Sequence, residues 1–426
     1  MHMVLRPALE LGGLEKAFCN DIMVRVAEIV AGRSLGYFLR NAPLTAKKGR
    51  KRKKTNRRSG NGVWGAWDNL PNELLVSVLQ RLSIIDYISF SGVCKSWRSA
   101  FIDFRKTLMK HQQPLVVVRP KYSKKSCVLY NMFDERSYRT MLPDLPCKYL
   151  LGFSCGNLIT FDRNRRFWLV NLMTKHELHF PILPQYVVDI CYSYLCALLF
   201  RSTRLSKTFM VLFSTKRNFL LLSESGASSW QKYILSNTSA RISDVKIFYG
   251  KIFVLTCDAL FGEFDPKADP VFKFFNISSP LQFRSNMSVK MVASADNLYA
   301  IVYQFTVDRY LSLFEIDHKK MDGVKQVHDL GAKSLFLSKF SSSVVDTTNW
   351  GAGNCVCVNH SEIVNRCSFF NLNGNLLGSL PVVWDNDHSK PYCWYFPSDG
   401  WDISCVGENS AYDHFYFRHQ HFLLSL

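Results

Sequence analysis

Hydrophobic residues change their spacing along the chain at about residue 110. Within 64–110 they recur every three or four positions, as in Leu74, Val78 and Leu82, which predicts amphipathic helices. Within 114–426, short apolar runs such as PLVVVR, FMVLFS and RYLSLFEID alternate with turn residues. Short strands separated by turns are typical of an all-β sandwich, barrel or propeller. We therefore expect a small all-α module followed by a large all-β domain.

Three short helices are predicted in the first module. Pro71 suits a first helical position, because its missing N–H would have no partner there. Ser83 and Asp86 resemble a capping box, with Asp in place of Glu, that opens a second helix. A third helix carries Trp97 and Phe101. A module of this size has a thin core and often depends on a partner.

A weak internal repeat favours a propeller among the all-β folds. The segments 149–174, 242–266 and 289–317 each have the pattern of a strand, a tight turn, a strand, a polar turn and a strand. The last two begin about 47 residues apart, which is a spacing of propeller blades. The repeat is degenerate, and about five to seven blades would fit the length.

Composition sets limits on the compartment and on metal chemistry. The 13 cysteines form no Cys-x-x-Cys pair and lie singly in apolar runs, as free thiols do in a reducing compartment. Cys355 and Cys357 would share one face of a strand, and a buried strand pair is favoured over half a metal site. No secretory signal and no membrane-spanning apolar stretch is expected.

The net charge of +19 is concentrated near the N-terminus. Nine basic residues and no acidic residue lie within 47–58: Lys47, Lys48, Arg50, Lys51, Arg52, Lys53, Lys54, Arg57 and Arg58. Such a block is a local address or tail, not a property of the fold. We interpret 47–63 as a disordered basic linker that is a candidate nuclear-import signal. An N-terminal extension (1–46) precedes it, either as an isolated helix or as poorly ordered chain.

The residues around Pro71 and Trp97 resemble the F-box. Its diagnostic parts are Leu70-Pro71-x-Glu73-Leu74-Leu75 and, further on, Val93-Cys94-Lys95-Ser96-Trp97-Arg98. The resemblance implies that this module binds a Skp-type linker protein and, through it, a cullin ubiquitin ligase. The implied adaptor-binding residues are Leu70, Pro71, Leu74, Leu75, Val93, Cys94 and Trp97. We expect Leu70, Pro71 and Leu75 to face the partner, whereas Trp97 is favoured as core.

The rest of the chain resembles the plant F-box family that ends in a KIB-type β-propeller. Residues 328–358 resemble a late blade of that family, with a Leu-Gly turn, a Leu-Phe-Leu strand and a Ser-rich turn. The segment WYFPS at 394–398 resembles its closing Trp-x-x-Pro-Ser. Val356-Cys357-Val358 departs from the usual Ile-Tyr-Phe strand, and the first sixty or so residues have no recognised counterpart.

No catalytic, cofactor or metal site is predicted. Gly60-x-Gly62-x-x-Gly65 follows a basic linker rather than a strand, so it is not read as a dinucleotide fingerprint. Two polar clusters are read as ordinary loop and strand positions: His414, His419 and His421, and the pair Asp385 and Asp387.

Two functions are therefore considered, and neither is enzymatic. The first is a substrate adaptor of a Skp–cullin–F-box ubiquitin ligase, in the nucleus, the cytoplasm or both, that holds an unidentified target on its propeller. The second is a nuclear, nucleic-acid-associated protein that uses 47–58. The second is disfavoured because 47–58 contains no aromatic residue for base stacking, although Trp64 and Trp67 lie just beyond. No membrane partner and no cofactor is expected.

Overall fold

The computed structural model describes most of the chain between Leu70 and Pro397. Residues 83, 111, 120–125, 143–148, 173–176, 189–193, 203–206, 236–239, 276–286, 295, 305–309, 318–322, 349–350, 352, 360–365 and 383–389 are excepted. The chain divides into two compact units, Met1–Gln112 and Gln113–Leu426. The predicted disordered extension and the capping box at Ser83 lie outside the described residues.

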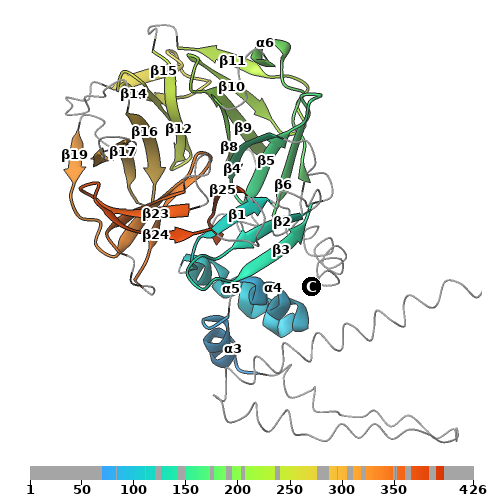
Figure 1. Ribbon diagram of the computed structural model, residues 1–426. Coiled ribbons are helices and arrows are strands. Elements are labelled where there is room, and N and C mark those ends of the chain that lie inside the picture. The colour runs from blue at the N-terminus through green and yellow to red at the C-terminus, as the bar shows by residue number, and fades with distance from the viewer. Residues whose placement is uncertain are drawn as a thin grey trace, which may run out of the picture. The chain divides into compact units, whose positions relative to one another are not determined.

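The described part of the first unit consists of three helices, as predicted (Figure 1). They are α3 (Asn72–Leu79), α4 (Ile84–Val93) and α5 (Lys95–Lys110). Helix α3 begins one residue later than expected, since Pro71 is its N-cap with an extended ψ of 142°. The Pro71 carbonyl accepts hydrogen bonds from the Leu74 and Leu75 N–H groups at 3.1 and 3.2 Å, which closes the first turn.

Aromatic packing between α4 and α5 forms the core of the helical module. The rings of Phe90 and Trp97 are 4.5 Å apart, and those of Tyr87 and Phe101 are 5.9 Å apart. The Gln112 side-chain amide donates a hydrogen bond to the Tyr87 hydroxyl at 2.9 Å. Burial and the neighbouring carboxylate of Asp86 raise the pKa of Tyr87 above its ordinary value.

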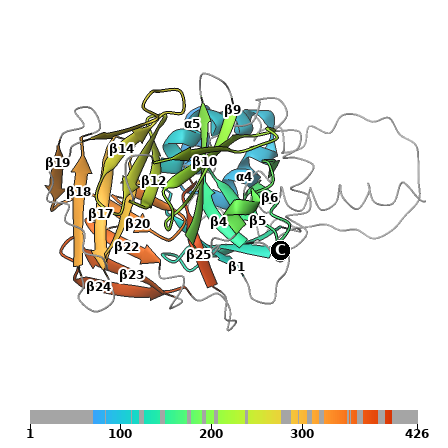
Figure 2. The same ribbon diagram turned by 90° about the horizontal axis from the view of Figure 1, so that it is seen from above.

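The second unit is a six-bladed β-propeller, which confirms the predicted fold class (Figure 1, Figure 2). Three meandering four-stranded sheets and their strands are, in order from the innermost strand, β4 (Tyr149–Ser154), β5 (Asn157–Phe161), β6 (Phe167–Asn171) and β7 (Glu177–Leu178); β12 (Ile242–Phe248), β13 (Lys251–Thr256), β14 (Phe261–Phe264) and β15 (Phe272–Phe275); and β16 (Ser288–Ala293), β17 (Leu298–Gln304), β18 (Tyr310–Ile316) and β19 (Val324–Val327). These sheets contain the three repeat units read from the sequence.

A fourth meandering sheet follows a short helix, α6 (Gln185–Val188). Its strands are β8 (Leu195–Ser202), β9 (Lys207–Ser214), β10 (Phe219–Glu224) and β11 (Gln231–Ile234). Neighbouring sheets meet mainly through their innermost strands, since β4 contacts β8, β12 contacts β9 and β16, and β16 contacts β21. Gly152 on β4 is required by this approach, because a Cβ there would lie 2.1 Å from the carbonyl oxygen of Ala197 on β8.

The last strand closes the ring by pairing with the first. β25 (Lys390–Tyr395) is the innermost strand of the sheet that continues with β1 (Leu115–Arg119), β2 (Ser126–Tyr130) and β3 (Ser137–Met141). β25 runs antiparallel to β1, with Trp394 opposite Val116. It also contacts β4 and β22, the neighbours on either side. Strands from the two ends of the unit therefore share one blade.

The fifth blade in chain order departs from the simple meander. Its strands lie in the order β21 (Ser342–Asp346), β20 (Lys333–Leu337), β22 (Cys355–Asn359), β23 (Arg366–Asn371) and β24 (Leu376–Pro381). β20 and β22 are parallel, with Leu335 opposite Val356. This is the region whose sequence resembles a late blade of the KIB-type propeller.

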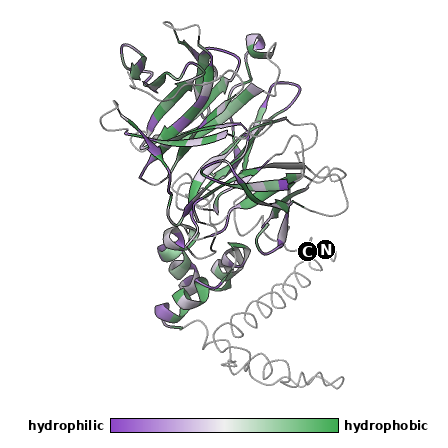
Figure 3. Cartoon of the chain, turned by 60° about the vertical axis from the view of Figure 1, so that its left-hand side comes forward, coloured by the Kyte–Doolittle hydropathy of each residue, from purple (hydrophilic) through white to green (hydrophobic). Residues whose placement is uncertain are grey.

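Apolar side chains of adjacent sheets pack into separate clusters between the blades (Figure 3). Hydrophobic residues run along the strands of the propeller, as their β-branched and aromatic composition requires. One cluster joins Ile159 of β5 to Leu212 of β9, and another joins Val254 of β13 to Leu220 of β10. Each blade is thus held by the neighbours on both of its faces.

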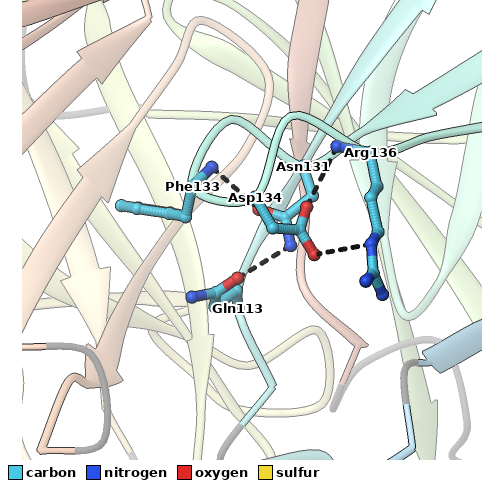
Figure 4. Close-up of polar contacts among 5 residues, drawn as sticks. All are labelled: Gln113, Asn131, Phe133, Asp134 and Arg136. Atoms are coloured by element: carbon cyan, nitrogen blue, oxygen red, sulfur yellow. Dashed lines mark hydrogen bonds and ion pairs between the residues drawn. The ribbon is translucent and has the colours of Figure 1, made fainter.

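The turn between β2 and β3 fixes the chain where it enters the propeller (Figure 4). The buried amide of Asn131 donates to the Gln113 side chain at 2.7 Å and accepts from the Phe133 N–H at 3.0 Å. Asp134 Oδ1 accepts the Arg136 N–H at 3.1 Å, and the same two side chains form an exposed ion pair. Asn131 therefore ties the residues just before β1 to the turn after β2.

Candidate functional site

Apolar side chains are exposed where α3 begins. Leu74 is 43% exposed, Pro71 is exposed and Leu70 is half-buried. Residues three or four positions apart lie on the same side of a helical turn, so Leu74 lies next to both Leu70 and Pro71. We call these three residues the α3 surface. It is a compact apolar surface of the kind that binds another protein.

Two of the predicted adaptor-binding residues lie in the core instead. Leu75 and Trp97 are 0% exposed within the protein, so neither offers surface to a partner. The placement of Trp97 agrees with the preference for core, whereas that of Leu75 differs from the expectation. One position along a helix turns a side chain by about 100°, which places Leu74 outside and Leu75 inside.

Val93 and Cys94 are half-buried at the end of α4 and the start of α5. They join the two helices whose aromatic residues form the core, so they carry both a packing role and some accessible surface. The nine basic residues of 47–58 lie outside the described residues. So do Gly60, Gly62, Gly65 and the predicted loop and strand positions Asp385, Asp387, His414, His419 and His421.

A cluster of charged and hydroxyl side chains lies between three innermost strands of the propeller. It consists of Asp244 and Lys246 on β12, Lys290 on β16 and Ser342 on β21, and we call it the axial cluster. Asp244 Oδ2 accepts the Met291 N–H at 2.7 Å, and Lys246 Nζ donates to the Ser342 carbonyl at 2.8 Å. Burial raises the pKa of Asp244, and the positive charge of Lys290 opposes that rise.

The turn between β20 and β21, residues 338–341, reaches the same region. Lys290 Nζ donates to two carbonyl oxygens of this turn at 2.7 Å each, and the Phe153 N–H of β4 donates to a third at 3.4 Å. The Trp394 N–H of β25 donates to Ser341 Oγ at 2.9 Å. Because its groups bond to one another across several blades, the axial cluster joins the blades rather than presenting a free catalytic set.

Sequence reasoning missed the axial cluster. We had found no charged groups that could lie at the centre of a propeller, yet Asp244, Lys246 and Lys290 do. A signal was available, since these three residues interrupt the first strand of two of the repeat units, and the first strand of a blade is its innermost strand.

The cysteines of the described residues are free thiols. Cys355 and Cys357 lie on β22 and are 4% and 0% exposed, which confirms the predicted buried strand pair. The Cys355 thiol lies 3.3 Å from the Ser334 hydroxyl. Burial raises the pKa of Cys357 and Cys393 well above the ordinary value, and that of Cys196 to about 11. Thiols in this state are poor nucleophiles.

Two wider searches of the described part of the chain gave negative results. No group of three or more His, Cys, Asp or Glu side chains could hold a metal ion there. No helix in that part is long and apolar enough to cross a membrane.

Two family models match the chain in the order of its two units. The F-box domain model matches residues 67–108, and the KIB1-4 β-propeller model matches residues 129–388, which is more than half of the chain. The helices α3 to α5 lie almost wholly within the first match, and most of the blades lie within the second.

Relatives from Arabidopsis thaliana are similar over part of the chain. F-box protein At5g25290 is 27% identical over 120 residues, which covers 28% of this chain and 29% of the relative. F-box only protein 7 is 27% identical over 120 residues, covering 27% and 29%. F-box protein At1g69090 is 22% identical over 181 residues, covering 39% and 43%. The matches thus span less than half the length of these relatives.

Solved β-propellers are only distantly similar. The β-propeller domain of Myceliophteria thermophila Cps50 (Swd1) has a TM-score of 0.35 and 11% identity, covering 63% of this chain and 86% of that chain. YCF48 from Cyanidioschyzon merolae has a TM-score of 0.33 and 12% identity, covering 63% and 74%. Scores this low carry no weight in the fold assignment, which rests on the strand pairing.

Proposed function

Because the chain belongs to the KIB1-4 β-propeller family and carries an F-box domain, we propose that it is the substrate-recruiting subunit of a Skp–cullin–F-box ubiquitin ligase. The F-box binds a Skp-type linker protein, which connects it to a cullin. The propeller binds the target protein. The chain itself performs no chemistry.

The α3 surface is the observation that carries this proposal. Leu74 is 43% exposed on the outside of α3, within the segment that the F-box model matches. An exposed Leu beside an exposed Pro has no packing role in this chain, and burial against a partner would stabilise the complex. Burying one Leu contributes about 1.5–3 kcal/mol.

The adaptor works by placement. A target held on the propeller stays beside the ubiquitin-transfer machinery, because both are linked through one chain. Linkage of this kind gives effective concentrations of about a millimolar for short connections. The many loops at the blade ends can vary without disturbing the strands, so they suit recognition of a particular target.

Co-purification with a Skp-type linker tests the proposal. Replacing both Leu70 and Leu74 with Ala should weaken linker binding by more than about tenfold, since two apolar contacts are lost. Leu75 is unchanged, so the helical module keeps its core. Circular dichroism should show an unchanged fold, and isothermal titration calorimetry should measure the loss of affinity.

Gln80→Ala is the matched control, because Gln80 is exposed at the other end of α3. It should bind the linker as the unchanged chain does. Full linker binding by the folded double variant would rule out the α3 surface. A chain that binds the linker but promotes no ubiquitylation of any co-purified protein would contradict the adaptor role.

The basic residues of 47–58 supply an address in this proposal. A cluster of nine basic residues matches the pattern read by nuclear import. Deleting 47–58 from a fluorescent fusion should shift it from the nucleus to the cytoplasm, as measured by the ratio of the two intensities. Replacing the nine residues with Gln keeps the length and should have the same effect; an unchanged ratio would refute the import role.

A further inference from the structure

Six side chains form an aromatic and basic patch at one end of the β8–β11 sheet. Four are exposed apolar residues: Ile182 (55%), Tyr186 (47%), Tyr194 (39%) and Ile234 (53%). The other two are the exposed cations Lys216 and Lys232. We call these six residues the β11 patch. Isolated exposed apolar residues are ordinary, but a group of this size marks an interaction site.

Strand pairing brings these residues together although they span more than fifty positions of the sequence. Ile234 is opposite Phe219, where β11 ends and β10 begins. Leu195 is opposite Ser214, where β8 begins and β9 ends, so Tyr194 and Lys216 lie at this same end of the sheet. Helix α6, which carries Tyr186, lies beside β11 (Figure 1).

Each lysine of the patch lies over an aromatic ring. Lys232 Nζ is 4.9 Å from the centre of the Tyr186 ring and 4.7 Å from that of Phe219. Lys216 Nζ is 4.8 Å from the centre of the Tyr194 ring. A ring attracts the cation electrostatically but leaves its N–H groups free for an anion on the other side.

The patch is held rigidly by the segment that leads into α6. The Trp230 side chain donates to the Pro181 carbonyl at 3.2 Å. Leu183 and Arg165 are joined twice, through a backbone hydrogen bond of 2.9 Å and a guanidinium hydrogen bond of 3.2 Å. A surface fixed before binding loses little conformational entropy when a ligand arrives.

The charge of the patch is not neutralised within the protein. Neither Lys216 nor Lys232 forms an ion pair with a carboxylate of the described residues. The opposite end of the same sheet differs, because there Lys207 pairs with Glu224 at 2.6 Å. The complement of the β11 patch is therefore a ligand with negative charges and apolar side chains.

We propose that the β11 patch binds an acidic segment of the target protein that also carries apolar residues. This inference rests on the proposed function and names the class of segment that the propeller recruits. Carboxylates of the segment pair with Lys216 and Lys232, while its apolar side chains pack against Ile182 and Ile234. The two aliphatic residues favour a peptide over a nucleic acid, since bases stack on aromatic rings.

Fluorescence anisotropy with two labelled 12-residue peptides tests the proposal on the full chain. One peptide alternates Glu and Leu, and the other alternates Lys and Leu. The Glu–Leu peptide should bind, the Lys–Leu peptide should bind at least tenfold more weakly, and added salt should weaken the first complex. Equal binding of the two peptides, or no binding of the Glu–Leu peptide, would overturn the proposal.

Charge-reversing variants locate the site. Exchanging Lys216 and Lys232 for Glu should weaken binding of the Glu–Leu peptide at least tenfold, whereas exchanging both for Arg should preserve it. The matched control exchanges Lys267 and Arg366 for Glu, because both are exposed on other blades and the change in net charge is identical. Equal loss in the control and the Lys216 and Lys232 variant would show that only net charge matters, which refutes the site.

Two further readouts separate this inference from its alternatives. The Lys216→Glu, Lys232→Glu variant should still co-purify with the Skp-type linker, because the helical module is unchanged. Failure of the unchanged chain to bind the linker would refute the proposed function, whereas peptide binding would be measured independently. A single-stranded 12-nucleotide DNA that binds the patch in place of the Glu–Leu peptide would overturn the proposal in favour of nucleic acid.

Discussion

The helical module and the propeller distribute their buried residues differently. In the helices, Phe90, Trp97 and Phe101 contribute to one small core between α4 and α5. In the propeller, buried residues are divided among separate clusters between neighbouring sheets, and the ring is closed by β25. The comparison indicates that the module is sensitive to any change in its core, whereas the propeller is sensitive above all to changes at its closure.

Removing the closing strand should have the largest effect. A chain that ends at Val382 lacks β25 and so leaves one edge of β1 unpaired. We expect the propeller to lose its protease-resistant core, because the loss exceeds the whole stability of about 5–15 kcal/mol of a typical domain. Limited proteolysis followed by mass spectrometry measures this. A shortened chain with an intact β-rich fragment would show that closure is dispensable.

A matched pair of Trp variants sharpens the comparison. Trp97 and Trp394 are both 0% exposed, and each replacement by Ala should reduce local stability by about 3–5 kcal/mol. Trp97→Ala should unfold the helical module and leave exchange in the propeller unchanged. Trp394→Ala should raise exchange in several blades, since its indole N–H donates to the Leu337 carbonyl in another sheet at 2.9 Å.

Hydrogen–deuterium exchange read by peptide distinguishes these two outcomes. Faster exchange in the propeller after Trp97→Ala would contradict the separation of the two units. Faster exchange confined to β25 after Trp394→Ala would mean that closure is a local property of one blade.

The smallest expected effect concerns the turn shown in Figure 4. Asn131→Ala removes hydrogen bonds to Gln113 and Phe133 at a buried site, and should lower the unfolding free energy by about 1–3 kcal/mol. Asp134→Ala in the same turn removes an exposed ion pair and should change it by less than about 1 kcal/mol. Urea unfolding followed by fluorescence measures both. Equal effects would show that Asn131 is not an anchor.

Much of the fold could be predicted because it depends on local patterns. The spacing of Val78 and Leu82 gave a helix, and the three repeat units gave strands that form the inner parts of three blades. The parallel pairing of β20 with β22 could not be predicted, since a strand's residues do not state which neighbour it joins. The same reason hid the order of the fifth blade.

The candidate sites were predicted less fully than the fold. Motif spacing located the α3 surface, but not that Leu74 is outside and Leu75 inside, because that choice depends on how α3 packs. The β11 patch was not foreseen at all. Its residues come from 182–234 and meet only after strand pairing brings the ends of β8 and β11 to one end of a sheet.

The pairing of β25 with β1 has a consequence for synthesis on the ribosome. Leu115 of β1 precedes Lys390 of β25 by roughly 275 residues. At about 5–20 residues per second, β1 emerges some 14–55 s before its partner exists. During that interval the apolar strand Leu115–Arg119 keeps one open edge, which is a template for pairing with other chains. A nascent chain of this protein therefore needs protection of that edge by chaperones until translation is almost complete.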